Sequence, residues 1–258
     1  MNKLTDAIKH LIIINVILFV TPQLLKLDFT NILGLNFPKN EGFGIWQYVS
    51  HMFMHGSFGH ILFNMYGLWA FGTPLEQIWG KSKFIFFYFS AGLGAGIIYT
   101  LVNYYQFNGF YEALLESGIS NSDLTNVFNF SAGTNSQFIE NANRILTRNG
   151  NIKIYPGMGN DLIQASNYYN MKAVGASGAV YGVLVAFGIH FKDAKLALLF
   201  FPVPIAAKYF IPLMILGDLF FGMTKYSVGN IAHFAHIGGA LIGFIIAWYW
   251  KNNQFKSH

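Results

Sequence analysis

Six apolar stretches, each close to the length of a membrane-spanning helix, constrain this chain more than any other feature. About 20 mainly apolar residues are needed to cross the hydrocarbon core of a bilayer. Charged residues make up only 10% of the chain, against about 25% in a typical soluble domain. We therefore expect an all-α fold, a polytopic membrane protein built as a six-helix bundle. The stretches cover approximately residues 8–25, 57–75, 84–104, 175–191, 206–223 and 232–250.

The basic residues predict how this bundle is oriented. Lys3 and Lys9 precede the first apolar stretch, as in a signal peptide, but Thr21 and Pro22 follow it instead of a small-residue cleavage site. We expect this stretch to be retained as the first span. Because short cytoplasmic segments are enriched in lysine and arginine, both termini are predicted to be cytoplasmic. We expect the bundle to lie in the cell membrane. Nine of the 16 basic residues lie on that side: Lys3, Lys9, Lys81, Lys83, Lys192, Lys195, Lys208, Lys251 and Lys256.

Residues 105–173 form the one section of the chain that resembles a soluble protein. The section is rich in Asn, Gly and Ser, and it lies on the outer side of the predicted bundle. Residues 110–118 and 136–150 are predicted as short amphipathic helices. A loop this long is usually either functional or disordered, and both interpretations stay open. We treat residues 1–258 as a single membrane domain with 105–173 as an extracytoplasmic insertion.

Composition excludes several classes of function. The chain has no cysteine, which excludes disulfides, thiolate chemistry and cysteine-ligated metals. The net charge of +5 comes from scattered residues, and the aromatic side chains lie in apolar stretches. We therefore expect the lipid bilayer to surround the protein, and we expect no nucleic acid as partner.

His60 and Asn64 are the first polar pair inside a predicted span. They are four residues apart, so a helix projects both from one face. Each can donate a hydrogen bond, which suits the stabilisation of a developing oxyanion. Buried polar residues in bundles also often do no more than bridge two helices, and this alternative stays open.

Ser177 lies in the string Gly175-Ala-Ser177-Gly178, at the start of the fourth predicted span. Unpaired amides at a helix N-terminus create a positive field that favours an oxyanion. The flanking glycines permit a close approach of substrate or of another helix, and Tyr181 lies one turn beyond the serine. Position 179 is Ala, so the string differs from the G-x-S-x-G elbow of hydrolases. A packing patch of small residues is the alternative.

His236 lies in the sixth predicted span, three residues before the pair Gly239 and Gly243. This G-x-x-x-G spacing lets two helices approach closely. A histidine on that face is placed to accept the proton of a serine on the facing helix, plausibly the fourth span. A structural histidine bonded to backbone or to His233 is the alternative.

Taken together, the three sets predict one site at the outer ends of the even-numbered spans. Ser177 is its nucleophile and His236 its base. A carboxylate is missing from these spans, apart from Glu76 at the inner end of the second. Asp218, in the fifth, is expected to lie deeper or on another face. The prediction is therefore a Ser-His dyad.

These motifs resemble the rhomboid family of intramembrane serine proteases. The resemblance covers residues 46–104 and 172–249, through HMFMHGSFGHILFN, EQIWG, GASG and AHIGGALIG. It implies a six-helix core, no metal and no cofactor, and membrane-protein substrates cleaved near the outer face. It further implies an oxyanion hole of His60, Asn64 and the Ser177 amide, Tyr181 stacked on His236, and a structural His55. The long segment 105–173 departs from the family pattern.

Three other functions are compatible with parts of this pattern. A metal or haem carrier would use the histidines, although no buried carboxylate is expected beside them. An inactive family member would only bind membrane partners, and the presence of Ser177 and His236 argues against it. A proton-coupled transporter would need a carboxylate relay, which spans two, four and six lack.

Overall fold

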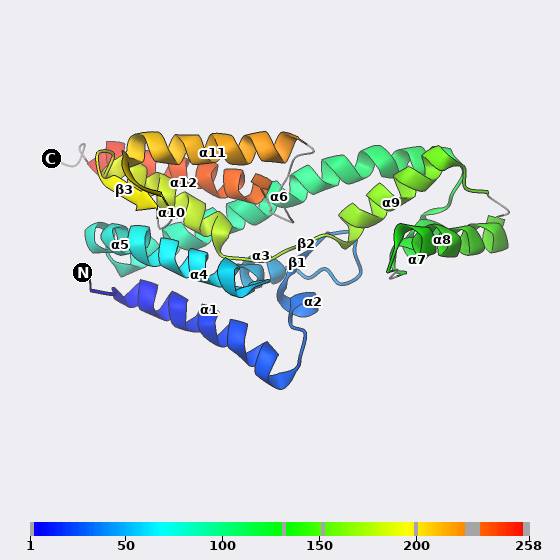
Figure 1. The fold of residues 1–258 in the computed structure, drawn as a ribbon, viewed down its shortest axis with the longest axis horizontal. Coiled ribbons are helices and arrows are strands. Elements are labelled where there is room, and N and C mark those ends of the chain that lie inside the picture. The colour runs from blue at the N-terminus through cyan, green and yellow to red at the C-terminus, as the bar shows by residue number, and fades with distance from the viewer. Residues whose placement is uncertain (1–2, 131–132, 151–152, 199–200, 225–232, 255–258) are drawn as a thin grey trace. The chain divides into compact units, whose positions relative to one another are not determined.

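The structure is a computed structural model that describes residues 3–130, 133–150, 153–198, 201–224 and 233–254. The chain divides into two compact units (Figure 1), which are described separately. Unit 1 comprises residues 1–35, 44–99 and 173–258, and unit 2 comprises residues 36–43 and 100–172. Lys256, which contributed to the predicted orientation, lies outside the described residues.

Unit 1 is built mainly from helices. The segment α4, η2 and α5 runs as one helix interrupted by the π-helical turn η2, and it ends at Gly80, whose φ is +80°. In the hairpin of β3 and β4, Lys195 pairs with Ala206 and Leu196 with Ile205. The elements are α1 (Asp6–Leu25), α2 (Thr30–Leu33), β1 (Leu35–Asn36), α3 (Gln47–Ser50), η1 (His51–Phe53), α4 (Phe58–Gly67), η2 (Leu68–Gly72), α5 (Thr73–Trp79), the first part of α6 (Lys81–Glu116), β2 (Lys172–Ala173), α10 (Ser177–His190), β3 (Lys195–Leu198), β4 (Phe201–Ala206), α11 (Ala207–Met223) and α12 (His233–Gln254).

Three described helices are long and apolar enough to cross a membrane: α1, α6 and residues His233–Asn253 of α12. The helix α10 is apolar but shorter. Large apolar side chains are exposed along α1, α11 and α12, as expected of helices that face lipid. The helical, apolar fold agrees with the predicted class, and the count of six spans stays a prediction. Examples of the exposed side chains are Ile13, Ile17, Leu213, Leu216, Phe220, Leu241 and Ile245.

Glu76 on α5 caps the beginning of α1. Its carboxylate accepts the backbone amides of Ala7 at 2.9 Å and Ile8 at 3.1 Å, and the hydroxyl of Thr5. The first amides of a helix have no partner within the helix, and an anion there also interacts favourably with the helix dipole. Glu76 is buried, so this contact fixes where α1 starts.

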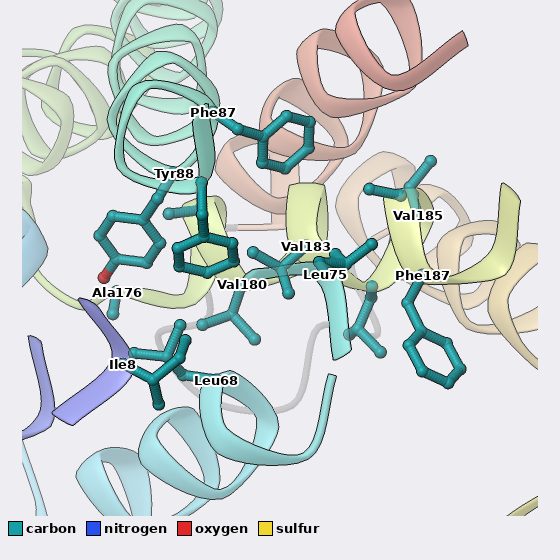
Figure 2. Close-up of a cluster of buried hydrophobic side chains, with 14 of the residues drawn as sticks. Ile8, Leu68, Leu75, Phe87, Tyr88, Ala176, Val180, Val183, Val185 and Phe187 are labelled. Carbon is teal, nitrogen blue, oxygen red and sulfur yellow. The ribbon is translucent and has the colours of Figure 1, made fainter. Parts of the chain in front are cut away.

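The core of unit 1 lies around α10. Figure 2 shows apolar side chains of α1, η2, α5, α6 and α10 meeting there, and helices in a membrane associate through close packing of this kind. The cluster holds the start of α10 against its neighbours. Its labelled members are Ile8, Leu68, Leu75, Phe87, Tyr88, Ala176, Val180, Val183, Val185 and Phe187.

Glycines bring α10 and α12 into backbone contact. A Cβ added to Gly239 would lie 1.9 Å from the carbonyl oxygen of Gly178. A Cβ added to Gly243 would lie 2.5 Å from Cα of Gly182. The spacing of four residues on each helix places the four glycines along one seam. Ser177 and His236 therefore lie on helices that pack without intervening side chains at this seam.

Unit 2 has a hydrophobic core of its own. It contains the second part of α6, α7 (Asn121–Phe128), α8 (Asn135–Gly150) and α9 (Pro156–Asn170). Ser120 caps α7 by accepting the amide of Asp123 at 3.1 Å. The predicted helix at 136–150 lies within α8, whereas 110–118 is largely the end of α6, which stops before Gly118 (φ +86°). The most buried core residues are Phe107, Leu114, Leu124, Val127, Phe128, Ala142, Leu146, Leu162 and Ala165.

Candidate active site

Ser177 is the first residue of α10 and follows a turn that only glycine fits. Gly175 has a φ of +123°, and a Cβ added there would lie 2.6 Å from Nε2 of His60. The same Cβ would lie 3.6 Å from Oγ of Ser177, so His60 and Ser177 flank this glycine. The amide of Gly175 donates to the carbonyl of His51 at 2.9 Å, which ties the turn to η1.

His236 contacts Ser177 directly. Its Nε2 lies 2.9 Å from Oγ of Ser177, within hydrogen-bond distance. The ring is buried and stacks on Tyr181, with centroids 4.2 Å apart and planes inclined by 11°. Tyr181 comes from α10, one turn after Ser177, so one helix supplies both the hydroxyl and the surface that orients the ring.

The expectation that Asp218 lies away from this site is wrong. Its Oδ1 lies 3.2 Å from Nδ1 of His236 and 2.6 Å from Nδ1 of His233. Its Oδ2 accepts the hydroxyl of Tyr181. The side chain is buried, because α11 packs against both α10 and α12 and turns this residue toward them. The expectation that no buried carboxylate accompanies the histidines is wrong for the same reason.

The predicted location of Asp218 was wrong because no motif surrounds it. A signal was present, since an ionisable residue inside an apolar helix is a candidate for function by default. What the pattern could not supply was the rotation of α11 about its axis. That rotation depends on packing against α10 and α12 rather than on the residues next to Asp218.

His60 and Asn64 lie on α4, as their spacing predicted. Asn64 is buried, and its Nδ2 has no hydrogen-bond partner among the described residues. Both ring nitrogens of His55 are likewise buried without such a partner, and its ring meets His60 edge-on at 5.0 Å. Buried donors without partners are costly unless something binds them. The side-chain amide of Asn64 is thus a buried donor without a partner among the described residues.

The same residues also contain the one group of possible metal ligands found in the described parts of the chain. Ligand atoms of Asp218, His233 and His236 all lie within 4.8 Å of one another. Two imidazoles and a carboxylate form a known type of metal-binding set. His51, in contrast, is buried with Nδ1 bonded to the carbonyl of Gln47 at 2.7 Å.

Apolar helices and a part-buried contact between a serine and a histidine define an integral membrane protein with a candidate catalytic site. Comparison with known families is in agreement with this class. The chain belongs to the rhomboid family: the Rhomboid domain matches residues 42–120 and 150–253. Residues 121–149, which include α7 and most of α8, lie outside the match.

Individual relatives share 25–34% of their residues with this chain over the matched segments. Rhomboid protein 1, mitochondrial, of Saccharomyces cerevisiae is 25% identical over 203 residues, which are 78% of this chain and 40% of that protein. Rhomboid protease GlpG of Serratia proteamaculans is 34% identical over 70 residues, 26% of this chain and 25% of that protein. GlpG of Yersinia pestis is 34% identical over 92 residues, 30% of this chain and 32% of that protein. The chain therefore spans less than half the length of these relatives.

Proposed function

We propose that this protein is an intramembrane serine endopeptidase that hydrolyses peptide bonds in or near transmembrane segments of membrane proteins. The observation that carries the proposal is the 2.9 Å contact between Oγ of Ser177 and Nε2 of His236. A nucleophile within hydrogen-bond reach of a base, whose ring is oriented by further groups, is the arrangement of serine hydrolases. The name of the GlpG relatives, rhomboid protease, supports the same activity.

Acylation begins with proton transfer from Ser177 to His236. As Oγ bonds to the scissile carbonyl carbon, Nε2 of His236 takes the hydroxyl proton. The carbonyl oxygen gains the negative charge of a tetrahedral intermediate. When the intermediate collapses, the C–N bond breaks and the imidazolium returns its proton to the departing amine. The product is an acyl ester on Ser177.

Water then releases the second product. Nε2 of His236 takes a proton from water as its oxygen bonds to the ester carbon. Collapse of the second intermediate breaks the ester bond, and His236 gives the proton back to Oγ of Ser177. Each proton taken by His236 is returned in the same half-reaction, so the enzyme is regenerated without a metal or cofactor.

Charge on the carbonyl oxygen is stabilised by three donors in this proposal: the Ser177 amide, His60 and Asn64. The amide lies at the start of α10, where helical amides have no internal partner. Nδ2 of Asn64 is buried and makes no hydrogen bond to the described residues. Such donors, held in place before reaction, typically supply a factor of about 100–1000 in turnover each.

The substrate must present an unwound segment to Ser177. A peptide carbonyl within a transmembrane helix is hydrogen-bonded, and the helix shields it from attack. Small or helix-breaking residues near the outer face fit this requirement. We further propose six spans with both termini in the cytoplasm, in the cell membrane, and residues 105–173 as an extracytoplasmic insertion.

Labelling with a fluorophosphonate tests the proposal on the full chain purified in detergent. We expect labelling of the wild type and loss of labelling in both Ser177→Ala and His236→Ala. Ser117→Ala is the matched control, because this hydroxyl is bonded to the carbonyl of Ala113 in unit 2. Cleavage of a transmembrane substrate should follow the same pattern. Labelling that persists in Ser177→Ala would refute the assignment.

Metal binding is a second candidate function, favoured by the cluster of Asp218, His233 and His236. Elemental analysis of the purified protein distinguishes the two. A stoichiometric metal in protein that never labels, lost in His233→Ala, would replace the protease proposal by a metal carrier. Labelled protein without stoichiometric metal would exclude the carrier.

A further inference from the structure

Asp218 is a buried carboxylate on α11 to which the reaction proposed above gives no role. Its Oδ1 is shared by Nδ1 of His236 at 3.2 Å and Nδ1 of His233 at 2.6 Å. Its Oδ2 accepts the hydroxyl of Tyr181. Three donors from two helices thus surround one carboxylate. An ion in an apolar environment is stable only where such donors replace water.

The carboxylate determines which nitrogen of His236 carries the proton. An ionised carboxylate only accepts hydrogen bonds, so Nδ1 of His236 must donate to Oδ1. In the neutral ring, Nε2 then has a free lone pair, 2.9 Å from Oγ of Ser177. This is the tautomer that a base needs in order to take the serine proton. The opposite tautomer would point an N–H at the hydroxyl.

Tyr181 links the two influences on the ring. It stacks on His236 at 4.2 Å and donates its hydroxyl to Asp218. The ring plane is therefore held by stacking and the ring rotation by the carboxylate. When His236 becomes an imidazolium during reaction, the adjacent negative charge stabilises it.

We infer that Asp218 is a positioning residue of the active site, which holds His236 in the tautomer and orientation that activate Ser177. The inference rests on the proposed function. It extends the predicted dyad to a chain of three groups from three helices: Ser177 on α10, His236 on α12 and Asp218 on α11. Asp218 acts through His236 and does not touch the substrate.

The alternative is that Asp218 only ties α11 to α12 through its shorter bond to His233. The two roles differ in their consequences. If Asp218 only connected the two helices, Asp218→Asn and His233→Asn would weaken this hydrogen bond to the same extent, and each would lower the free energy of unfolding. A positioning role makes Asp218→Asn far more harmful to turnover than His233→Asn, because an amide at position 218 can donate to Nδ1 and favour the wrong tautomer.

The test compares Asp218→Asn, Asp218→Glu and His233→Asn with the wild type in a cleavage assay. We expect Asp218→Asn to lower kcat by about 100- to 10,000-fold with KM within about threefold, as loss of the aspartate does in serine proteases. Asp218→Glu, which keeps a carboxylate, should recover part of kcat. Wild-type kcat in Asp218→Asn would overturn the inference.

A measurement on the wild type covers the case in which Asp218→Asn does not fold. Nitrogen-15 NMR of labelled histidine should show His236 protonated on Nδ1 and not on Nε2 at pH 8. The opposite tautomer would overturn the inference. Ser177→Ala, run in parallel, separates the two proposals. Cleavage that needs Ser177 and His236 but not Asp218 would support the protease and overturn the positioning role of Asp218. Wild-type protein that neither labels nor cleaves overturns both.

Discussion

Polar residues inside the apolar helices differ in how far the sequence alone reveals them. Ser177, His236, His60 and Asn64 stand in short strings with glycines or with a partner one turn away, so each has a local pattern. Asp218 has none, and its predicted location was wrong. Its contacts come from α10 and α12, which are distant in sequence, and depend on how α11 is rotated against them. Their roles in catalysis remain predictions that mutagenesis tests.

At this scale we predict that His60→Ala and Asn64→Ala each lower kcat by about 100- to 1000-fold, the range for losing one oxyanion donor. KM should change little, because the donors act on charge that forms only in the transition state. Steady-state cleavage of a transmembrane substrate in detergent measures both constants. His10→Ala is the control, since His10 is exposed on α1. Unchanged turnover in both variants would contradict their assignment.

The elements were predictable where hydropathy changes sharply and unpredictable where packing decides. The predicted stretch 206–223 is nearly α11 (Ala207–Met223). In contrast, α9 (Pro156–Asn170) has a polar sequence and was not predicted. Its buried side chains, among them Leu162 and Tyr169, become a helix face only against the rest of unit 2. The hairpin of β3 and β4 was likewise missed.

The seam between α10 and α12 leads to a prediction for Gly239→Ala. The added Cβ would lie 1.9 Å from the carbonyl of Gly178, so the helices must separate. Overpacking of this kind costs about 1–3 kcal/mol, and it moves His236, one turn away, from Ser177. The melting temperature and the rate of fluorophosphonate labelling should both fall.

Gly109→Ala is the matched control for the seam, because a Cβ there meets nothing within 4 Å. Alanine is favoured over glycine in a helix by about 0.5–1 kcal/mol, so stability should stay equal or rise. If Gly239→Ala labels as fast as Gly109→Ala, close contact at the seam is not needed for the site.

The cap on α1 leads to a separate prediction of stability. Glu76→Ala removes the acceptor of two backbone amides and a hydroxyl. We expect the free energy of unfolding to fall by about 3 kcal/mol. Glu76→Gln keeps one oxygen acceptor and should lose less. Unfolding in detergent measures the difference. Glu116→Ala, at an exposed position, should change stability by under about 0.5 kcal/mol; an equal effect of both alanine variants would argue against the cap.

At the scale of the whole molecule, the described residues form two hydrophobic cores. The sequence of residues 105–173 is compatible with a functional loop and with a disordered one, since Asn, Gly and Ser are common in both kinds of loop. The described residues there are mostly helical and bury apolar side chains in a core of their own. Part of this unit, residues 121–149, lies outside the family match.

Separate cores predict separate responses to mutation. Leu162→Ala, in the core of unit 2, should destabilise that unit by about 2–5 kcal/mol. Hydrogen exchange read by mass spectrometry should show loss of protection in α7, α8 and α9, with α10 and α12 unchanged. Fluorophosphonate labelling of Ser177 should persist. Asn167→Ala, an exposed change on the same helix, serves as control; loss of protection throughout unit 1 would refute independence.

The contact between Glu76 and the start of α1 has a consequence for biosynthesis. Thr5 and Glu76 are 71 residues apart, and ribosomes add about 5–20 residues per second, so the cap follows α1 by roughly 4–14 s. During that interval the first turn of α1 must be solvated by water or lipid headgroups. A nascent chain arrested before Glu76 should therefore carry a frayed α1, which becomes ordered only when α5 is translated.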